Sequence, residues 1–361
     1  MFKFNQLKSI HLEITNRCQA RCPMCSRNIH GGVDNPNLVI ADWTLDQFKE
    51  IITSEVAIQA DHIYFCGNFG DPIINSDLIP MCQHLTDLNP KLRVRIHTNG
   101  GARSTDWWAN LAKALPSDHV VIFGIDGLED THHLYRIGTK FETVIKNAQA
   151  FMQAGGRAEW VFIKFKHNEH QADIAEQMAK DLGFSQFTMK NSNRFVGGPE
   201  FDVKDLNGNV IYKLQPPTDN VVTFIDRKVV DKLDDWVNTS TINCKAELEK
   251  EIYIDAHRQV YPCCFLASAP YYHVDSDSIV LPVKQRIVDE HTVLMNTLGS
   301  TLSSTDKSIQ EILDSESWQT VWAESWENKR LLTCARICGT SEKQLFSKPA
   351  DQFVKRVNLN E

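Results

Sequence analysis

Three cysteines near the start of the chain have a spacing that can bind metal. Cys18, Cys22 and Cys25 lie within eight residues, separated by three and then by two positions. Three thiolates at this spacing can hold an iron-sulfur cluster and leave one iron without a protein ligand. A Cys-x2-Cys pair is also half of many zinc sites, and His11 or His30 could complete one here. The cysteines alone therefore leave a cluster and a zinc ion as alternatives.

Most of the other cysteines form a second group near the end of the chain. The chain has 10 cysteines, and residues 1–8 lack the apolar core of a secretion signal, which favours metal ligation over a disulfide framework. Two groups indicate two metal sites. Cys82 lies in a helical pattern and is expected to be buried, and Cys66 ends a predicted strand. The second group consists of Cys244, Cys263, Cys264, Cys334 and Cys338.

Composition limits the class of protein and of partner. The chain has 361 residues, of which 42% are hydrophobic and 23% charged, as in ordinary globular proteins. A net charge of -8 argues against a nucleic-acid groove as the main working surface. No apolar stretch approaches the roughly 18 residues of a membrane span. We therefore expect a cytoplasmic protein with neither a nucleic-acid nor a membrane partner.

The elements that must position the first cysteines alternate between short strands and longer helices over residues 9–191. Such alternation predicts a parallel sheet of β-α units. Six units are too few for a closed eight-stranded barrel and fit an α/β fold with a partial (β/α)6 barrel of TIM type, whose functional groups lie at the C-terminal ends of the strands. The predicted strands are 9–15, 61–66, 92–97, 119–125, 158–165 and 185–190, and the predicted helices are 44–58, 76–88, 104–115, 139–154 and 169–182.

Polar residues follow three of these strands. The second strand leads into Gly67-Asn68-Phe69-Gly70-Asp71-Pro72, where the glycines would let the backbone approach a ligand and the aspartate would accept from an ammonium group. Asn99 follows the third strand, and Asp126 follows the fourth, with Arg136 further along. All of these residues and the first cysteines belong to the same end of the predicted barrel.

Together, the cysteine spacing and the strand-end residues resemble the radical S-adenosylmethionine (radical SAM) superfamily. The resemblance implies a 4Fe-4S cluster on Cys18, Cys22 and Cys25, whose open iron chelates SAM. In two places this chain departs from the family pattern: the glycine motif has one insertion and aspartate for glutamate, and Gly124 stands where a serine is frequent. The implied SAM-binding residues are Gly67, Asn68, Gly70, Asp71, Asn99, Asp126 and Arg136, with the arginine clamping the SAM carboxylate as a fork.

The second cysteine group resembles the auxiliary-cluster module called twitch, which is related to the longer SPASM domain. A cysteine, a hairpin over 252–264, a helix over 308–328 and a Cys-x3-Cys pair follow one another, and Arg258 stands where the family's hairpin has a glycine. The resemblance implies one auxiliary 4Fe-4S cluster, and a zinc ion on the same four thiolates is the alternative. The implied ligands are Cys244, Cys263, Cys334 and Cys338, with Cys264 in reserve for Cys263.

These assignments divide the chain into four segments. In the segment that bridges the two cysteine groups, a hairpin over 203–214 is predicted around Asn207-Gly208. Trp318, Trp322 and Trp326, spaced four apart in the last predicted helix, are expected to form a packing face. The segments are the radical SAM core at 1–196, the bridging segment at 197–243, the twitch-like domain at 244–345 and a C-terminal tail at 346–361.

Three further residues are candidates for catalysis. Glu13 and Lys164 alternate with apolar residues in the first and fifth predicted strands, so their side chains are expected to point into the barrel. A buried charge is costly unless it is paired, so we expect a Glu13–Lys164 pair, either as a structural contact or as a substrate anchor or proton relay. Cys66 is either a small buried residue or a site residue beside the glycine motif.

The resemblance implies a reaction and leaves its substrate open. Reductive cleavage of SAM would give methionine and a 5′-deoxyadenosyl radical that abstracts a hydrogen from the substrate, with a flavodoxin- or ferredoxin-type reductant supplying the electron. Because the core starts by about residue 9, without an appended peptide-recognition domain, we expect oxidation or rearrangement of a small polar metabolite, such as a sugar or amino-acid derivative. One alternative is maturation of a ribosomal peptide or protein by cross-linking, epimerisation or oxidation. Another is a non-catalytic zinc or iron-sulfur protein for structure or electron transfer.

Overall fold

One nine-stranded sheet organises the fold. The computed structural model describes residues 1–192, 194–195, 198–219, 231–272, 281–327, 330–340 and 353–360. Within these residues the strand order of the large sheet is β11-β10-β1-β2-β3-β4-β5-β6-β13. The six strands from β1 to β6 pair in parallel and in chain order, which confirms the predicted α/β fold with a partial barrel. Their bounds are β1 Ser9–Leu12, β2 His62–Phe65, β3 Arg93–Thr98, β4 His119–Gly124, β5 Ala158–Lys164 and β6 Gln186–Asn191.

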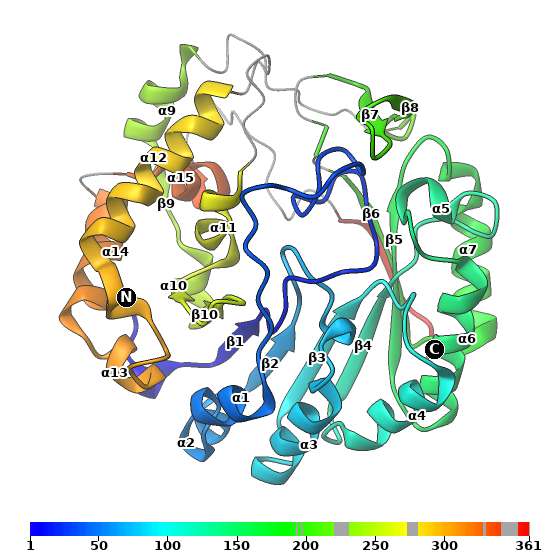
Figure 1. Ribbon diagram of the computed structural model, residues 1–361, viewed down its shortest axis with the longest axis horizontal. Coiled ribbons are helices and arrows are strands. Elements are labelled where there is room, and N and C mark those ends of the chain that lie inside the picture. Colours follow the sequence, from blue (N-terminus) through cyan, green and yellow to red (C-terminus); the bar gives the residue numbers. More distant parts are fainter. Residues whose placement is uncertain are drawn as a thin grey trace.

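Helices of the N-terminal half cover the outer face of these strands (Figure 1). The helix predicted over 44–58 is two helices, because Thr44 caps the first by accepting from Gln47 N at 3.2 Å and Thr53 caps the second. The helix expected from residue 169 begins with a 3-10 turn. The bounds are α1 Leu45–Ile51, α2 Ser54–Gln59, α3 Leu78–Leu88, α4 Thr105–Ala114, α5 His132–Tyr135, α6 Phe141–Gln153 and α7 Ala172–Leu182, with 3-10 helices at Phe4–Gln6, Pro72–Ile74 and Glu169–Gln171.

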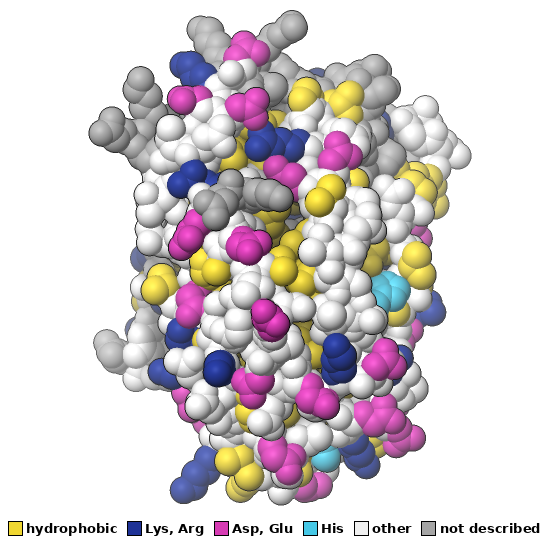
Figure 2. All heavy atoms as spheres, turned by 90° about the vertical axis from the view of Figure 1, so that its left-hand side faces the viewer, with side chains coloured by type: hydrophobic (Ala, Val, Ile, Leu, Met, Phe, Trp, Pro, Cys, Tyr) yellow, Lys and Arg dark blue, Asp and Glu magenta, His cyan; other side chains and the backbone are white. Residues whose placement is uncertain are grey.

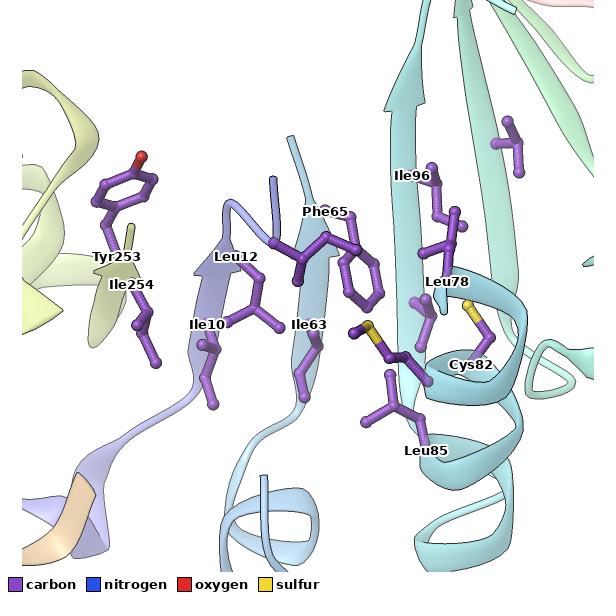
Figure 3. Packing of buried hydrophobic residues seen from close by; sticks show 14 of the residues in the cluster. Ile10, Leu12, Ile63, Phe65, Leu78, Cys82, Leu85, Ile96, Tyr253 and Ile254 are labelled. Carbon is purple, nitrogen blue, oxygen red and sulfur yellow. The ribbon is translucent and has the colours of Figure 1, made fainter. Parts of the chain in front are cut away.

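The main core lies between the strands and these helices. Alternate residues of β1 and β2 point toward α3, and Cys82 of that helix is fully buried among them, as predicted (Figure 3). Each such buried aliphatic or aromatic side chain contributes about 1.5–3 kcal/mol to stability. The other residues of these strands face the inside of the barrel. The labelled members of this cluster in Figure 3 are Ile10, Leu12, Ile63, Phe65, Leu78, Cys82, Leu85, Ile96, Tyr253 and Ile254.

The region of the second cysteine group continues the same sheet. β10 (Glu251–Ile254) pairs in parallel with β1 and forms the predicted hairpin with β11 (Val260–Tyr261). The predicted hairpin of the bridging segment is also present, as β7 (Phe201–Lys204) and β8 (Val210–Leu214). Arg258 adopts a φ of +64°, the left-handed conformation that favours the glycine usual at this turn. The cysteine loop that follows β1 and Cys263, which follows the β10–β11 hairpin, are therefore attached to neighbouring parts of one sheet.

C-terminal helices pack at the β10 edge of the sheet (Figure 1). Trp318 and Trp322 are fully buried, which confirms their predicted packing role, although the helix expected over 308–328 is interrupted where Ser315 accepts from the amide of Trp318. On the outer face of this region, acidic and basic side chains are interspersed with hydrophobic ones (Figure 2). The elements are α9 Leu233–Thr239, β9 Thr241–Ile242, α10 Lys245–Glu249, α11 Cys264–Ala267, α12 Leu281–Leu298, α13 Ile309–Leu313, α14 Glu316–Glu327, α15 Leu332–Cys338 and β12 Gly339–Thr340, with 3-10 helices at Ala269–Tyr271 and Gly299–Leu302.

The last strand, β13 (Phe353–Asn358), lies in the segment that the sequence assigned to a tail. It pairs antiparallel with β6 and so covers the free edge of the barrel sheet. Five of its six residues are exposed, so its sequence lacks the alternation that predicts a half-buried strand. None of the helices in the described ranges is long and apolar enough to cross a membrane.

Candidate active site

The loop that carries the first three cysteines leaves β1 and passes over the C-terminal ends of the strands (Figure 1). Cys25 N donates to Cys22 O at 2.9 Å, so the second and third cysteines share a turn. Cys22 is buried, while Cys18 and Cys25 are partly exposed. Burial raises the pKa of the Cys22 thiol, and the nearby Arg136 guanidinium acts in the opposite direction.

Each glycine of the motif after β2 is required by a close backbone contact. A Cβ at Gly70 would lie 2.0 Å from Thr15 O, and one at Gly67 would lie 2.1 Å from Gly70 O. Asp71 N donates to Arg17 O at 2.9 Å. The loop over 67–71 is therefore packed against the chain that leads into Cys18. The structure thus brings the glycine motif and the cysteine loop side by side.

Glu13 holds the same loop through its carboxylate. Oε1 accepts from Phe69 N at 2.8 Å and from Gly70 N at 3.1 Å, and Oε2 accepts from the Tyr253 hydroxyl of β10. Glu13 is 2% exposed, and burial raises its pKa to about 7 even though the three donors lower it. The side chain joins β1, the glycine loop and β10, so it is a positioning residue for the loop.

The buried position of Glu13 predicts a pH dependence of stability. Its pKa is higher in the folded chain than the 4.5 of an exposed glutamate, so its contribution to stability is complete below about pH 4.5 and is lost as pH rises through about 7. Between about pH 5 and pH 8, we expect the free energy of unfolding to fall by about 3 kcal/mol more in the wild type than in Glu13→Gln. Urea denaturation measures both proteins, with the exposed Glu50→Gln as the control. The same pH slope in wild type and Glu13→Gln would contradict the prediction.

Asp71 is buried and its oxygens accept from protein donors. Oδ2 accepts from Thr98 Oγ1 at 3.0 Å, from Asn99 N at 2.7 Å and from Asn99 Nδ2 at 2.6 Å, and Oδ1 accepts from Ile73 N at 3.2 Å. Burial raises the pKa of this carboxyl. In this arrangement Asp71 fixes the side chain of Asn99, the residue predicted from the end of the next strand.

Asp126 and Arg136 form a buried ion pair at the end of β4. Arg136 Nε lies 2.5 Å from Asp126 Oδ2, and Asp126 Oδ1 accepts from Ile163 N at 2.6 Å. Gly124 explains the departure from the family's serine, because a Cβ there would lie 2.2 Å from Arg136 Nη2. The arginine therefore occupies the space that a side chain at position 124 would need.

The predicted pair between Glu13 and Lys164 is wrong. Lys164 Nζ donates to both carboxylate oxygens of Asp219, at 2.6 and 2.8 Å. Asp219 belongs to the segment after the β7–β8 hairpin, whose return to the end of β5 no local pattern indicates. Lys164 is itself buried, as the strand alternation predicts, but it contacts this segment instead of Glu13.

Cys66 and the two histidines considered as zinc ligands have other surroundings. Burial raises the pKa of the Cys66 thiol to about 12, and its carbonyl oxygen lies 2.6 Å from His11 Nε2. Burial lowers the pKa of His11 to about 4. His30 contacts the β7–β8 hairpin, with Nδ1 2.9 Å from Asp202 O. Both imidazoles are thus engaged away from the thiols of the cysteine loop.

The four predicted auxiliary ligands line one small pocket of about 20 Å³. Cys244 precedes α10, Cys263 precedes α11, and Cys334 and Cys338 lie on α15. The described residues that line the pocket include Cys263 and not its neighbour Cys264. The remaining lining residues are Ile242, Pro262, Leu266, Trp322, Trp326, Thr333 and Ile337.

The donor set fits iron-sulfur ligation at both places, with three thiols in one loop and four around one pocket. As the side chains stand, no group of three or more Cys, His, Asp or Glu in the described ranges is close enough to hold a metal ion. Ligation at either place therefore stays a prediction.

Two residues of the site escaped the sequence analysis. Tyr253 alternates with Ile252 and Ile254 in β10 and points away from Ile254 (Figure 3), so strand alternation could have placed it on the same face of the sheet as Glu13. Gln19 donates to Asn99 Oδ1 at 2.6 Å, a contact between positions 80 residues apart that no local pattern indicates.

Comparisons with solved structures agree with the fold. The SAM-bound structure of the polyhistidine-tagged protein anSMEcpe superposes with a TM-score of 0.52 at 13% identity, over 92% of this chain and 86% of that one. Streptococcus suis SuiB superposes with a TM-score of 0.50 at 13% identity, over 79% of this chain and 68% of that one. At such identities the likeness concerns the fold alone.

Sequence comparisons identify the family. PqqA peptide cyclase from Bradyrhizobium diazoefficiens is 29% identical over 80 residues, which are 22% of this chain and 19% of that protein. PqqA peptide cyclase from Rhodopseudomonas palustris is 28% identical over 109 residues, which are 29% of this chain and 26% of that protein. The match thus spans about a fifth to a quarter of the length of these relatives. The family model of the Radical SAM superfamily matches residues 12–180. Residues 12–180 of the chain therefore belong to the radical SAM superfamily, which implies a 4Fe-4S cluster that works with SAM.

Proposed function

We propose that this protein is a two-cluster radical SAM enzyme that modifies a peptide or protein substrate. The observation that carries the radical chemistry is the packing of the glycine loop, through Gly70 and Asp71, against the chain that leads into Cys18. When bound to Cys18, Cys22 and Cys25, a 4Fe-4S cluster with SAM supplies the electron that cleaves SAM to methionine and a 5′-deoxyadenosyl radical.

The chain's own residues bind and orient the reactants in this proposal. The backbone of Gly67 and Gly70 lets SAM approach closely, and Glu13 keeps that loop in place through its two amide contacts. Asn99 and Arg136 present nitrogen donors at the strand ends, each held by a buried aspartate. Closure of the barrel end over SAM would exclude water from the reacting atoms. Cys66 and Lys164 remain candidates for contact with the substrate.

The curated relatives support a peptide substrate, whereas the sequence analysis expected a small polar metabolite. Both curated relatives are peptide cyclases, and the segments that match them make up 22% and 29% of this chain. The expectation of a small metabolite finds no support in the names of these two relatives. We therefore prefer the maturation of a ribosomal peptide, by cross-linking, epimerisation or oxidation.

Formation of 5′-deoxyadenosine tests the radical chemistry. The protein is reconstituted anaerobically with iron and sulfide, reduced with dithionite and given SAM. We expect 5′-deoxyadenosine and methionine in equal amounts. A colourless protein with stoichiometric zinc and no 5′-deoxyadenosine would refute the enzyme proposal. Addition of a short peptide encoded beside this gene tests the substrate: an altered peptide mass supports the proposal, and turnover of a metabolite alone would overturn the peptide assignment.

We propose that the four-cysteine pocket holds an auxiliary 4Fe-4S cluster, which accepts an electron from the substrate radical or anchors the substrate. In Cys334→Ala we expect about half of the bound iron to be lost, while 5′-deoxyadenosine still forms and product formation falls by at least roughly 10- to 100-fold, the loss that is typical when partners of metal ligands are removed. Iron analysis and product assays measure both effects. Cys264→Ala is the matched control, because Cys264 does not line the pocket among the described residues. Full iron content in Cys334→Ala would contradict the assignment.

A further inference from the structure

We propose that Asp71 and Asp126 each hold a nitrogen donor against a thiol of the cysteine loop, and that these donors raise the reduction potential of the cluster bound there. The inference rests on the proposed function, because it requires a cluster on Cys18, Cys22 and Cys25. It gives the two strand-end aspartates a role through Asn99 and Arg136 instead of through direct contact with SAM.

The first donor is the side-chain amide of Asn99. Its Nδ2 lies 3.5 Å from Cys18 Sγ and donates to Asp71 Oδ2 at 2.6 Å. The contacts of the amide oxygen fix the orientation of this side chain. Asn99 Oδ1 accepts from Gln19 Nε2 at 2.6 Å and from Gly101 N at 2.9 Å. Two donors on Oδ1 leave Nδ2 as the atom that faces the aspartate and the sulfur. Asp71 thus fixes an N–H group beside Cys18.

The second donor is the guanidinium of Arg136. Its Nη1 lies 3.7 Å from Cys22 Sγ, and its Nε lies 2.5 Å from Asp126 Oδ2. Asp126 is fully buried and is held in turn by Ile163 N. Gly124 leaves the space in which the guanidinium lies. The ion pair is therefore oriented with its positive end toward the sulfur of Cys22.

The same geometry at two thiols points to a common effect. One-electron reduction adds negative charge to a cluster and its thiolates, so nearby N–H donors and positive charge stabilise the reduced form. In each case the residue that carries the donor contacts both the aspartate and the sulfur. Removal of the Asn99 amide or of the Arg136 guanidinium is therefore expected to lower the reduction potential of the cluster.

A redox titration followed by electron paramagnetic resonance (EPR), without SAM, tests the inference on reconstituted full-length protein. In Arg136→Met and in Asn99→Ala we expect the ratio of reduced to oxidised N-terminal cluster at a fixed solution potential to fall about tenfold, which is about 59 mV for a one-electron couple. Arg136→Lys keeps the positive charge but loses the planar guanidinium with its several N–H donors, so we expect a smaller decrease of the reduction potential in this variant. Arg157→Met is the matched control, because it removes an exposed Arg157–Asp118 pair at the other end of the strands.

Gly124→Ala separates the position of the guanidinium from its charge. The added methyl would lie 2.2 Å from Arg136 Nη2 and must displace it, although no charge changes. We expect the same downward shift of potential in this variant. Gly198→Ala is the matched control, because no atom of the described residues lies within 4 Å of its added Cβ.

The outcomes distinguish this inference from the function on which it rests. No cluster in the reconstituted wild type would refute the proposed function itself. A normal cluster whose potential is the same in Arg136→Met, Asn99→Ala, Gly124→Ala and the two controls would overturn the inference alone. If Arg136→Met lost its cluster, Gly124→Ala and Asn99→Ala would decide, since both keep every proposed ligand and the arginine.

Discussion

Cys22→Ala is expected to abolish SAM cleavage and to remove about half of the bound iron. Cys22 is the buried member of the three-cysteine loop, and its carbonyl oxygen accepts from Cys25 N in the turn that presents Cys25. Without its thiolate, a cluster would keep two ligands in this loop, which is too few to leave a single open iron for SAM. Iron analysis and the formation of 5′-deoxyadenosine measure the loss.

Cys82→Ala is the matched control for this change. Cys82 is also buried, but it lies in α3 among apolar side chains of the core. Its replacement should cost about 1 kcal/mol of stability and leave iron content and SAM cleavage unchanged. Wild-type 5′-deoxyadenosine formation by Cys22→Ala would contradict the assignment of the loop.

Gly70→Ala is expected to lower the free energy of unfolding by about 2–4 kcal/mol and to weaken SAM binding at least tenfold. The added Cβ would lie 2.0 Å from Thr15 O and 2.7 Å from Thr15 C, so a backbone segment must move. The movement would also break the contact of Gly70 N with Glu13. Urea denaturation and equilibrium binding of SAM measure the two effects.

The same substitution at Gly198 should have little effect, because its Cβ would meet no atom within 4 Å in the part of the chain that the structure describes. A Gly70→Ala protein with the stability of Gly198→Ala and unchanged SAM affinity would show that the glycine loop is not packed as described.

The strands of the barrel were predictable because their signals are local. Short β-rich runs lie between longer segments of helical period, so β2 to β6 lie within a residue or two of their expected bounds. β1 is shorter than expected, since the chain leaves the ladder after Leu12 toward the cysteines. The two hairpins followed from Asn207-Gly208 and from the turn at Arg258.

The errors concern contacts between distant parts of the chain. Lys164 binds Asp219 because the bridging segment returns to the end of β5, and β13 forms because β6 offers it a free edge. Neither partner leaves a pattern in its own segment. The same holds for the site. The positions of Asp71, Asn99 and Asp126 at strand ends were predicted from local patterns, but the hydrogen-bond partner of each residue was not.

The EPR spectrum of dithionite-reduced Cys334→Ala, recorded with and without SAM, tests the central claim most directly. Under the proposed assignments this variant keeps only the cluster on Cys18, Cys22 and Cys25, whose open iron is free to bind SAM. We predict that excess SAM changes the g values of the spectrum. A reduced cluster whose spectrum is the same with and without SAM would contradict the claim that this loop holds a SAM-binding cluster.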